Sequence, residues 1–283
     1  MITLPPNLLI EPLLQEWLRE DIGRGDRATS ALIESKSIPQ QAIWLAKQPG
    51  VIAGLPFAEK IFSLLGDIDW HPQIKEGETC DSQQEILVCR AQPSTLLSGE
   101  RTALNLVMHL SGIASLTQSY VEKIADLPTQ LVDTRKTTPG LRVLEKYATQ
   151  LGGAVNHRFG LDDAAMIKEN HIQVAGGIEP AVKQVRKALP YPLMIEVETT
   201  TQAEVKEALA TDVDIIMLDN MSLSLMTEMV QLIRSRDKSI KVEASGNITL
   251  ETIRDVAKTG VDYISTSAPI TQANWLDLSM KLI

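Results

Sequence analysis

The chain has 283 residues, a formal net charge of −9 and 44% hydrophobic residues. Its length suffices for one large core or two smaller ones, and its acidic balance argues against a surface built for nucleic acid or anionic membranes. The sequence lacks an apolar run of the ~20 residues that a membrane span needs, and its start lacks the basic segment of a signal peptide. We therefore expect a cytoplasmic protein with no nucleic-acid or membrane partner, which holds any anionic ligand by a local cluster of cations.

The first third of the sequence predicts a small α+β domain with a mostly antiparallel sheet. Apolar residues at helical spacing predict a helix over residues 8–20, before the turn-rich segment DIGRGDRATS. A further helix is expected at 56–65. Short apolar runs predict strands at 41–48, 50–54, 67–78 and 85–92.

A long helix is then expected from Ser94 to about Ala125, with breaks at Gly99 and Gly112. After it, short apolar runs alternate with helix-patterned segments, which is typical of parallel strands joined by crossover helices. The expected strands lie at 129–135, 164–170, 193–199, 213–220, 241–247 and 261–268. Because a complete eight-stranded barrel takes ~250 residues, the pattern favours an incomplete α/β barrel of six or seven strands, with a doubly wound sheet as the alternative.

The predicted fold class is thus α/β, with an incomplete barrel beside an N-terminal α+β sandwich domain. Residues 1–112 are assigned to the sandwich domain and its linking helix, and residues 113–270 to the barrel that carries the site. Residues 271–283 are expected to form a C-terminal helix that packs back on the N-terminal domain. Polar residues at the C-terminal end of each predicted strand favour the barrel, since active sites of α/β barrels lie at that rim.

Basic residues gather at these strand ends and in the loops beside them. They are Arg135, Lys136, His157, Arg158 and Lys168. Arginine presents a planar fork suited to a carboxylate, and lysine a point charge suited to phosphate. The alternatives are a solvated Arg135-Lys136 pair on a loop and a purely structural His157. Lys168 ends an apolar run, where burial without a partner would be unfavourable, so we expect it at an open rim or in an ion pair.

Carboxylates and small polar turns follow the later strands. Glu196 and Glu198 share one face of their strand, and Asp219 ends the strongly apolar run before it. Carboxylates so placed suit sugar hydroxyls and the waters of a divalent cation, and ordinary solvation of strand ends is the less favoured alternative. Ser245, Gly246 and Asn247 precede a helix, where backbone N–H groups bind an anion or a side chain caps the helix.

Several motifs, read together, resemble the quinolinate phosphoribosyltransferase family. They are GERTALN, DTRKTTPGLR, GGAVNHRFGL, DAAMIKENH, IEVE, IMLDN and EASGNI, in the family's order, and the similarity extends from EDIGRGDRATS to LDLSM. The resemblance implies phosphoribosyl transfer from 5-phosphoribosyl-1-pyrophosphate to quinolinate with decarboxylation, giving nicotinate mononucleotide, pyrophosphate and CO₂. It also implies Mg²⁺ and a homodimer, or an assembly of dimers, with shared active sites.

The resemblance further implies a role for each matched residue. The quinolinate carboxylates would be held by Arg135, His157, Arg158, Lys168 and, from the partner subunit, Arg101. The phosphoribosyl donor would be held by Lys136, Glu198, Asp219, Ser245, Gly246, Asn247 and Ser267. Among these, Lys136, Lys168, Glu198 and Asp219 would be the catalytic residues, and Glu198 and Asp219 would bind the metal, directly or through water.

One departure and three alternatives accompany the resemblance. Where many family members carry a glycine after the last strand and a histidine beyond it, this chain has Ser267 and no following histidine, so that histidine's role does not transfer. The alternatives are a molybdenum-transport-associated relative of the same fold, a transferase that uses nicotinate, and a non-catalytic ligand-binding paralogue. A dicarboxylate needs more cations than nicotinate does, and a paralogue that only binds would not need Lys136, Glu198 and Asp219.

Overall fold

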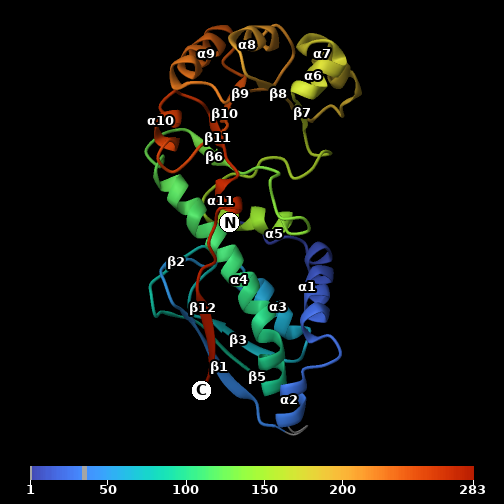
Figure 1. Cartoon of the computed structure of the whole chain (residues 1–283), viewed down its shortest axis with the longest axis vertical. Coiled ribbons are helices and arrows are strands. Elements are labelled where there is room, and N and C mark those ends of the chain that lie inside the picture. The colour runs from blue at the N-terminus through green and yellow to red at the C-terminus, as the bar shows by residue number, and fades with distance from the viewer. Residues whose placement is uncertain (1, 34–36) are drawn as a thin grey trace. The chain divides into compact units, whose positions relative to one another are not determined.

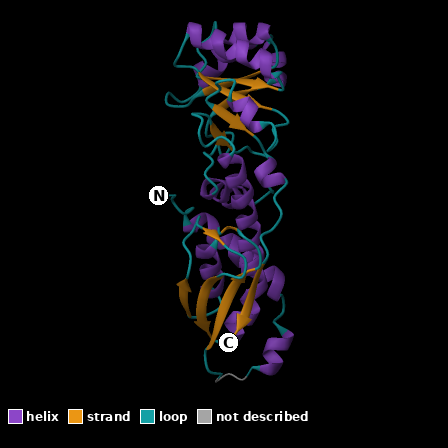
Figure 2. Ribbon diagram, turned by 90° about the vertical axis from the view of Figure 1, so that its left-hand side faces the viewer, coloured by secondary structure: helices purple, strands orange, loops and turns teal. Residues whose placement is uncertain are grey.

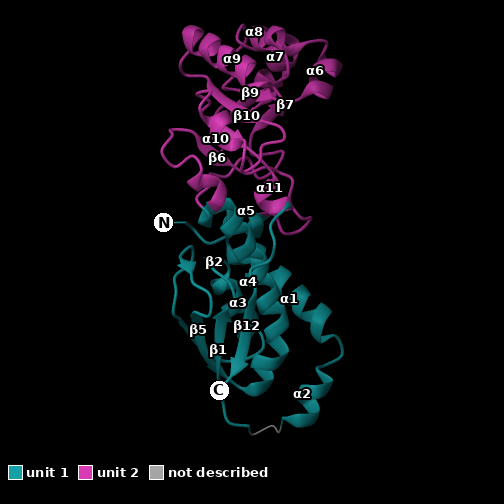
Figure 3. Ribbon diagram, turned by 60° about the vertical axis from the view of Figure 1, so that its left-hand side comes forward, with its two compact units in different colours: residues 1–118, 143–152, 272–283 teal, residues 119–142, 153–271 magenta. Residues whose placement is uncertain are grey.

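The computed structural model of the chain describes residues 2–33 and 37–283. It divides into two compact units (Figure 3): residues 1–118, 143–152 and 272–283 form unit 1, and residues 119–142 and 153–271 form unit 2. The division departs from the predicted one mainly at residues 143–152, which were placed in the barrel and belong to unit 1.

Unit 1 is built on an antiparallel sheet (Figure 2). Its four strands lie in the order β12-β1-β5-β3. The strands are β1 (Gln40–Ala46), β3 (Ile68–Pro72), β5 (Glu85–Ala91) and β12 (Leu278–Leu282). The predicted C-terminal helix is therefore wrong: residues 278–282 form a strand that pairs with residues 42–46. Without β12, the edge of β1 would leave its backbone N–H and C=O groups unpaired beside the buried Trp44. A short pair, β2 (Gly50–Val51) with β4 (Thr79–Cys80), completes the strands of this unit.

The helices described in unit 1 include α1 (Asn7–Ile22), α2 (Arg27–Leu32), α3 (Leu55–Ser63) and α4 (Pro93–Glu122). The predicted breaks at Gly99 and Gly112 are wrong, since α4 is continuous through both. A Cβ at Gly112 would lie 2.0 Å from the carbonyl oxygen of Asn274, so this glycine permits close packing and does not break the helix. Within the described residues, neither α4 nor any other helix has the length and apolar character needed to cross a lipid bilayer.

Helix α5 (Arg142–Leu151) packs within unit 1 because its inner face is apolar and carries buried polar groups. Glu145 is fully buried and lies 3.0 Å from Nε2 of His109. The hydroxyl of Tyr147 donates to Glu76 at 3.0 Å, and Glu76 also accepts the backbone N–H groups of Gly54 and Leu55 at the start of α3.

Unit 2 contains six parallel strands in the order β6-β11-β10-β9-β8-β7 (Figure 1). These strands are β6 (Gln130–Val132), β7 (Ala165–Ile167), β8 (Ile195–Thr199), β9 (Ile215–Asp219), β10 (Lys241–Ser245) and β11 (Tyr263–Ser265). The sheet ends at β6 and β7, so the prediction of an incomplete α/β barrel is confirmed. The helices between and after the strands are α6 (Glu169–Ala175), α7 (Ile178–Ala188), α8 (Gln202–Ala208), α9 (Leu223–Arg236), α10 (Ile253–Ala257) and α11 (Ala268–Thr271).

An aspartate–arginine pair is repeated at the N-terminal side of this sheet. Asp214 accepts the first N–H of β8 and a hydrogen bond from Arg186 of α7, both at 2.7 Å. Asp262 accepts the N–H of the second residue of β10 at 2.7 Å and a bond from Arg234 of α9 at 2.5 Å. Each pair fixes a helix to the start of a strand, and thereby sets the register that delivers the strand's other end to the rim.

Candidate active site

Carboxylates on the strands of unit 2 lie at two depths. Glu196 of β8 and Glu243 of β10 are 3% and 2% exposed, and we call them the deep pair. A second set of side chains lies one step further along the strands and is partly exposed. It consists of Glu198 on β8, Asp219 on β9 and the hydroxyl of Ser245 on β10, and we call these three residues the rim. In register, Asp219 is opposite Ser245. Because side chains alternate along a strand, Glu196 and Glu198 share one face, as the sequence predicts.

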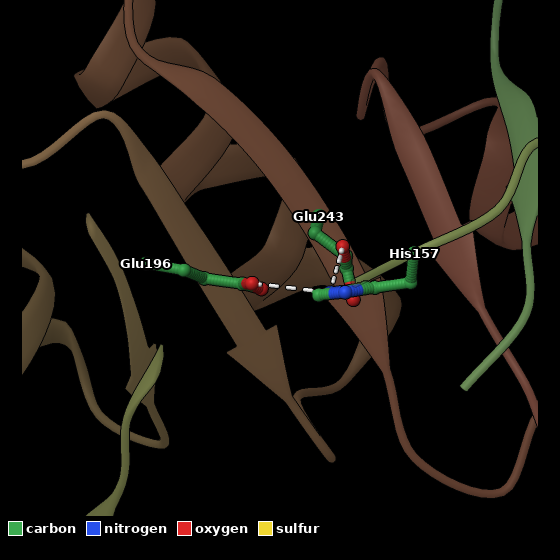
Figure 4. A group of neighbouring side chains, drawn as sticks. All are labelled: His157, Glu196 and Glu243. Atoms are coloured by element: carbon green, nitrogen blue, oxygen red, sulfur yellow. Dashed lines mark ion pairs between the residues drawn. The ribbon is translucent and has the colours of Figure 1, made fainter. Parts of the chain in front are cut away.

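The imidazole of His157 contacts the carboxylates of both Glu196 and Glu243 (Figure 4). Its Nε2 lies 3.1 Å from Glu196 and 3.5 Å from Glu243, while its Nδ1 accepts the backbone N–H of Arg158 at 2.7 Å. Since Nδ1 is an acceptor, the ring proton lies on Nε2 and points at the carboxylates. Both ring nitrogens of His157 are thus engaged within the protein. The side chain is better placed to orient Glu196 and Glu243 than to bind a ligand carboxylate itself.

The segment that carries His157 is anchored beside the open edge of the barrel at β6. Val155 forms a bridge with Val132, and Asp133 accepts the backbone N–H of His157 at 2.9 Å and the amide of Asn156 at 2.6 Å. Sequence reasoning did not assign Asp133 to the site. Its position at the end of an apolar strand, directly before the basic motif, is the signal that could have identified it.

The deep pair is strongly affected by burial. Burial, followed by the proximity of Glu196, raises the pKa of Glu243 to about 8. Oε1 of each glutamate is buried and has no hydrogen-bond partner among the described residues. Glu243 therefore holds a proton more readily than an exposed glutamate, and the pair carries less negative charge beneath the rim than two free carboxylates would.

The side chains of His157, Glu196 and Glu243 bring ligand atoms within 4.8 Å of one another, as a metal site requires. The hydrogen bond to Nδ1 argues against that use, since a metal on Nε2 would displace the ring proton and leave the imidazole anionic. The rim fits Mg²⁺ better, because Glu198 and Asp219 offer partly exposed oxygen ligands and leave room for waters and phosphate oxygens.

Three of the predicted cations lie together in unit 2. Burial, and next the charge of Arg135, lowers the pKa of Arg158, so these two guanidinium groups are close enough to repel. Nε of Arg135 is buried and has no hydrogen-bond partner within the described part of the chain. Lys168 forms an ion pair with Glu198 of the rim. Lys136, the residue after Arg135, is exposed. Two neighbouring arginines with an unused donor form a cationic cluster suited to an anion with more than one charge.

The predicted phosphate turn lies at the end of β10. Gly246 has a φ of 100°, and Asn247 has a φ of 49°. Asn220, which sequence reasoning did not assign to the site, contacts this turn from the end of β9. Ser267 precedes α11, and its carbonyl accepts the N–H groups of residues 270 and 271.

Arg101 lies in unit 1 on α4, where its side chain is 61% exposed and the nearest acidic atom, on Glu100, is 3.9 Å away.

Comparison with known proteins agrees with this architecture. Residues 26–111 match the model of the N-terminal domain of quinolinate phosphoribosyl transferase, and residues 113–281 match that of its C-terminal domain. A probable nicotinate-nucleotide pyrophosphorylase (carboxylating) from Synechocystis is 55% identical over 100% of this chain and 96% of its own length. The corresponding Bacillus subtilis protein is 40% identical over 98% and 94%. The crystal structure of NadC from Streptococcus pyogenes superposes with a TM-score of 0.94 at 40% identity, covering 99% of each chain.

An incomplete α/β barrel with a cationic cluster and a carboxylate rim, in a chain that also contains an antiparallel sandwich domain, defines a class of two-domain transferases. The chain belongs to the quinolinate phosphoribosyl transferase family.

Proposed function

We propose that this protein transfers the phosphoribosyl group of 5-phosphoribosyl-1-pyrophosphate to quinolinate and releases CO₂, giving nicotinate mononucleotide and pyrophosphate for NAD biosynthesis. Family membership over both domains and the printed activity of the relatives support this proposal. The structural observation that carries it is the Arg135–Arg158 pair with its unused donor. Two adjacent guanidinium groups in an acidic chain are unfavourable until a polyvalent anion binds them.

Quinolinate would bind over the deep pair. Arg135 and Arg158 would hold its two carboxylates, and Lys168 would complete the pocket, while His157 fixes the floor. A largely neutral Glu243 in that floor avoids repulsion of the dianion. The ring nitrogen would then attack the anomeric carbon of the donor. Positioning and electrostatic stabilisation supply most of the barrier reduction for such a step, so no protein nucleophile is required.

The donor would extend along the rim. Glu198 and Asp219 would face the ribose hydroxyls and Mg²⁺, and Lys136 would lie near the pyrophosphate. The turn of Ser245, Gly246 and Asn247, together with Ser267, would take the 5-phosphate. When bound, Mg²⁺ would neutralise charge that develops on the leaving pyrophosphate. The ion pair of Lys168 with Glu198 would link the quinolinate and donor sites, since one residue is assigned to each.

Once the ring nitrogen is alkylated, its positive charge stabilises the carbanion left when the adjacent carboxylate departs as CO₂. The remaining carboxylate must stay bound, and the forked contacts of Arg135 and Arg158 suit that role. We further propose a homodimer in which Arg101 reaches the site of the partner subunit, because its guanidinium is exposed and, among the described residues, its ion pair with Glu100 is a long one of 3.9 Å. The cytoplasmic location inferred from composition stays a prediction.

A product assay tests the proposed activity. Purified protein should form nicotinate mononucleotide from quinolinate only when both the donor and Mg²⁺ are present, as followed by chromatography. Arg135→Ala should reduce quinolinate turnover by about 100-fold or more, because it removes a charge-assisted contact and leaves the dianion undercompensated. Arg254→Ala is the matched control, since Arg254 pairs with Asp126 on the same unit's surface. The absence of nicotinate mononucleotide from the wild-type reaction would contradict the proposal.

A further inference from the structure

Asn220 joins the ends of two neighbouring strands of the rim. Its Nδ2 donates to Oδ2 of Asp219 at 2.8 Å, and its Oδ1 accepts from Nδ2 of Asn247 at 3.1 Å. Its backbone N–H also donates to the carbonyl of Ser245 at 3.0 Å. The side chain thus holds a carboxylate of β9 with one end of its amide and the turn after β10 with the other.

The backbone around this contact is unusual. Among residues 2–33 and 37–283, three residues other than glycine have positive φ, namely Gln83, Asn220 and Asn247, at 66°, 53° and 49°. Two of these three meet at the rim. Asparagine tolerates this conformation better than most residues, yet it remains less favourable than an extended or helical one. Backbone strain of this kind persists where the surrounding contacts hold it, often at functional sites.

Gly246 shows how closely the two turns approach. A Cβ at this glycine would lie 2.2 Å from Oδ1 and 2.5 Å from Cγ of Asn220, and 2.9 Å from its backbone nitrogen. The φ of 100° at Gly246 adds a second reason for glycine. The Asn220 amide therefore fills the space that a side chain at Gly246 would need, and the two turns form one packed unit.

We propose that Asn220 is a positioning residue that fixes the Asp219 carboxylate relative to the Ser245–Asn247 turn and so sets the distance between the ribose and 5-phosphate subsites of the donor pocket. The inference rests on the proposed function for the identity of that donor. It assigns to Asn220 no contact with substrate. Asn220 acts through Asp219 and Asn247, whose side chains it orients.

The amide is required because it is a donor at one end and an acceptor at the other. An aspartate at this position would have the same shape but no donor, and its charge would repel Asp219 at hydrogen-bond distance. A glycine would relieve the positive φ and delete both side-chain bonds. The two substitutions therefore separate the contribution of the amide from that of the backbone.

The test compares Asn220→Asp and Asn220→Gly with wild type in steady-state kinetics. Both variants should raise KM for the phosphoribosyl donor about tenfold or more, as expected for the loss of a hydrogen bond to a charged group, and should leave KM for quinolinate within about twofold. Gln83→Gly is the matched control, because it relieves a positive φ of similar size in a turn of unit 1. It should leave both KM values unchanged.

Binding of ribose 5-phosphate, measured by titration calorimetry, provides a readout that needs no turnover. Its Kd should rise about tenfold in both Asn220 variants and stay constant in Gln83→Gly. An equal rise in both KM values, or an unchanged sugar-phosphate Kd in folded Asn220→Gly, would overturn the inference. A wild-type protein that forms no nicotinate mononucleotide would instead refute the proposed function, and the inference would then be decided by the ribose 5-phosphate titration.

Discussion

At the scale of single residues, burial gives chemically identical side chains different properties. Glu196 and Glu243 lie beneath the rim, while Glu198 lies at it, although Glu196 and Glu198 are separated by one residue. Burial raises the pKa of Glu243 to about 8, and the bond from Arg158 to Nδ1 sets the tautomer of His157. The two buried glutamates beneath the rim therefore carry less negative charge than their composition suggests.

We expect Glu243 to make the stability of the protein fall as the pH rises from about 4.5 to about 8. In this range folded Glu243 keeps a proton that the unfolded chain has released, so the folded state binds more protons and stability decreases with pH. The stabilisation that Glu243 contributes is complete at pH values below its pKa in the unfolded chain. It is lost as the pH rises through its pKa in the folded protein. Glu243→Gln should flatten this dependence, as measured by urea unfolding at a series of pH values.

The contribution of Glu76 in unit 1 has to be separated from that of Glu243. Burial raises the pKa of Glu76 to about 7, so this residue also makes the stability fall as the pH rises. The comparison is best made between Glu76→Gln and the double variant Glu76→Gln, Glu243→Gln. If those two proteins show the same slope of unfolding free energy between pH 5 and pH 8, Glu243 does not hold the proton assigned to it here.

At the scale of elements, the two aspartate–arginine pairs explain how short strands reach the rim in register. Asp214 accepts a backbone N–H of β8 and a hydrogen bond from Arg186 of α7, the helix before β8. Asp262 likewise accepts a backbone N–H of β10 and a hydrogen bond from Arg234 of α9, the helix before β10. The pairs Arg186–Asp214 and Arg234–Asp262 are partly buried, so they are worth more than exposed ion pairs. They repeat because the underlying strand–helix unit repeats.

Asp262→Ala should lower the free energy of unfolding by about 1–3 kcal/mol, because it leaves a strand N–H and Arg234 without their acceptor. The amide of Val242 should exchange faster with solvent, which mass spectrometry of the β10 peptide detects. Asp255→Ala is the control, since Asp255 pairs with Lys258 at an exposed site, and its effect should stay within about 0.5 kcal/mol. Equal effects of the two variants would show that the pair does not anchor β10.

At the scale of the whole molecule, the predicted site residues are divided between the two units. Arg101 belongs to unit 1, whereas the other predicted residues, including Lys136, belong to unit 2. The proposed dimer would supply each pocket with an arginine from the partner chain. Exposure of Arg101 in its own chain agrees with that arrangement.

Mixing two inactive variants tests the shared site. Arg101→Ala and Lys136→Ala should each be nearly inactive, and their mixture should regain about a quarter of wild-type activity, because in a random mixture half of the dimers are mixed and each of these has one intact site. The measurement is nicotinate mononucleotide formation after subunit exchange, which mass spectrometry of differently tagged chains confirms. Exchange without recovered activity would contradict a site built from two chains.

Much of the fold follows from local patterns. The alternation of apolar strands and amphipathic helices predicts the parallel sheet of unit 2, and six strands were expected and found. Local patterns failed where distant contacts decide the structure. Residues 278–282 form a strand because β1 offers them an unpaired edge, and Gly112 lies within a continuous helix because Asn274 packs against it. Neither partner is near in sequence.

The sequence by itself determined the strand–helix alternation, the two domains and the residue types of the site, because periodicity and charge are properties of neighbouring residues. It placed Arg135, Arg158 and Lys168 among the candidates for this reason. Tertiary structure alone decided that burial raises the pKa of Glu243, that both nitrogens of His157 are engaged, and that Asn220 joins two strands. These features depend on burial and on atoms brought together from separate strands, and neither can be read from the order of the residues.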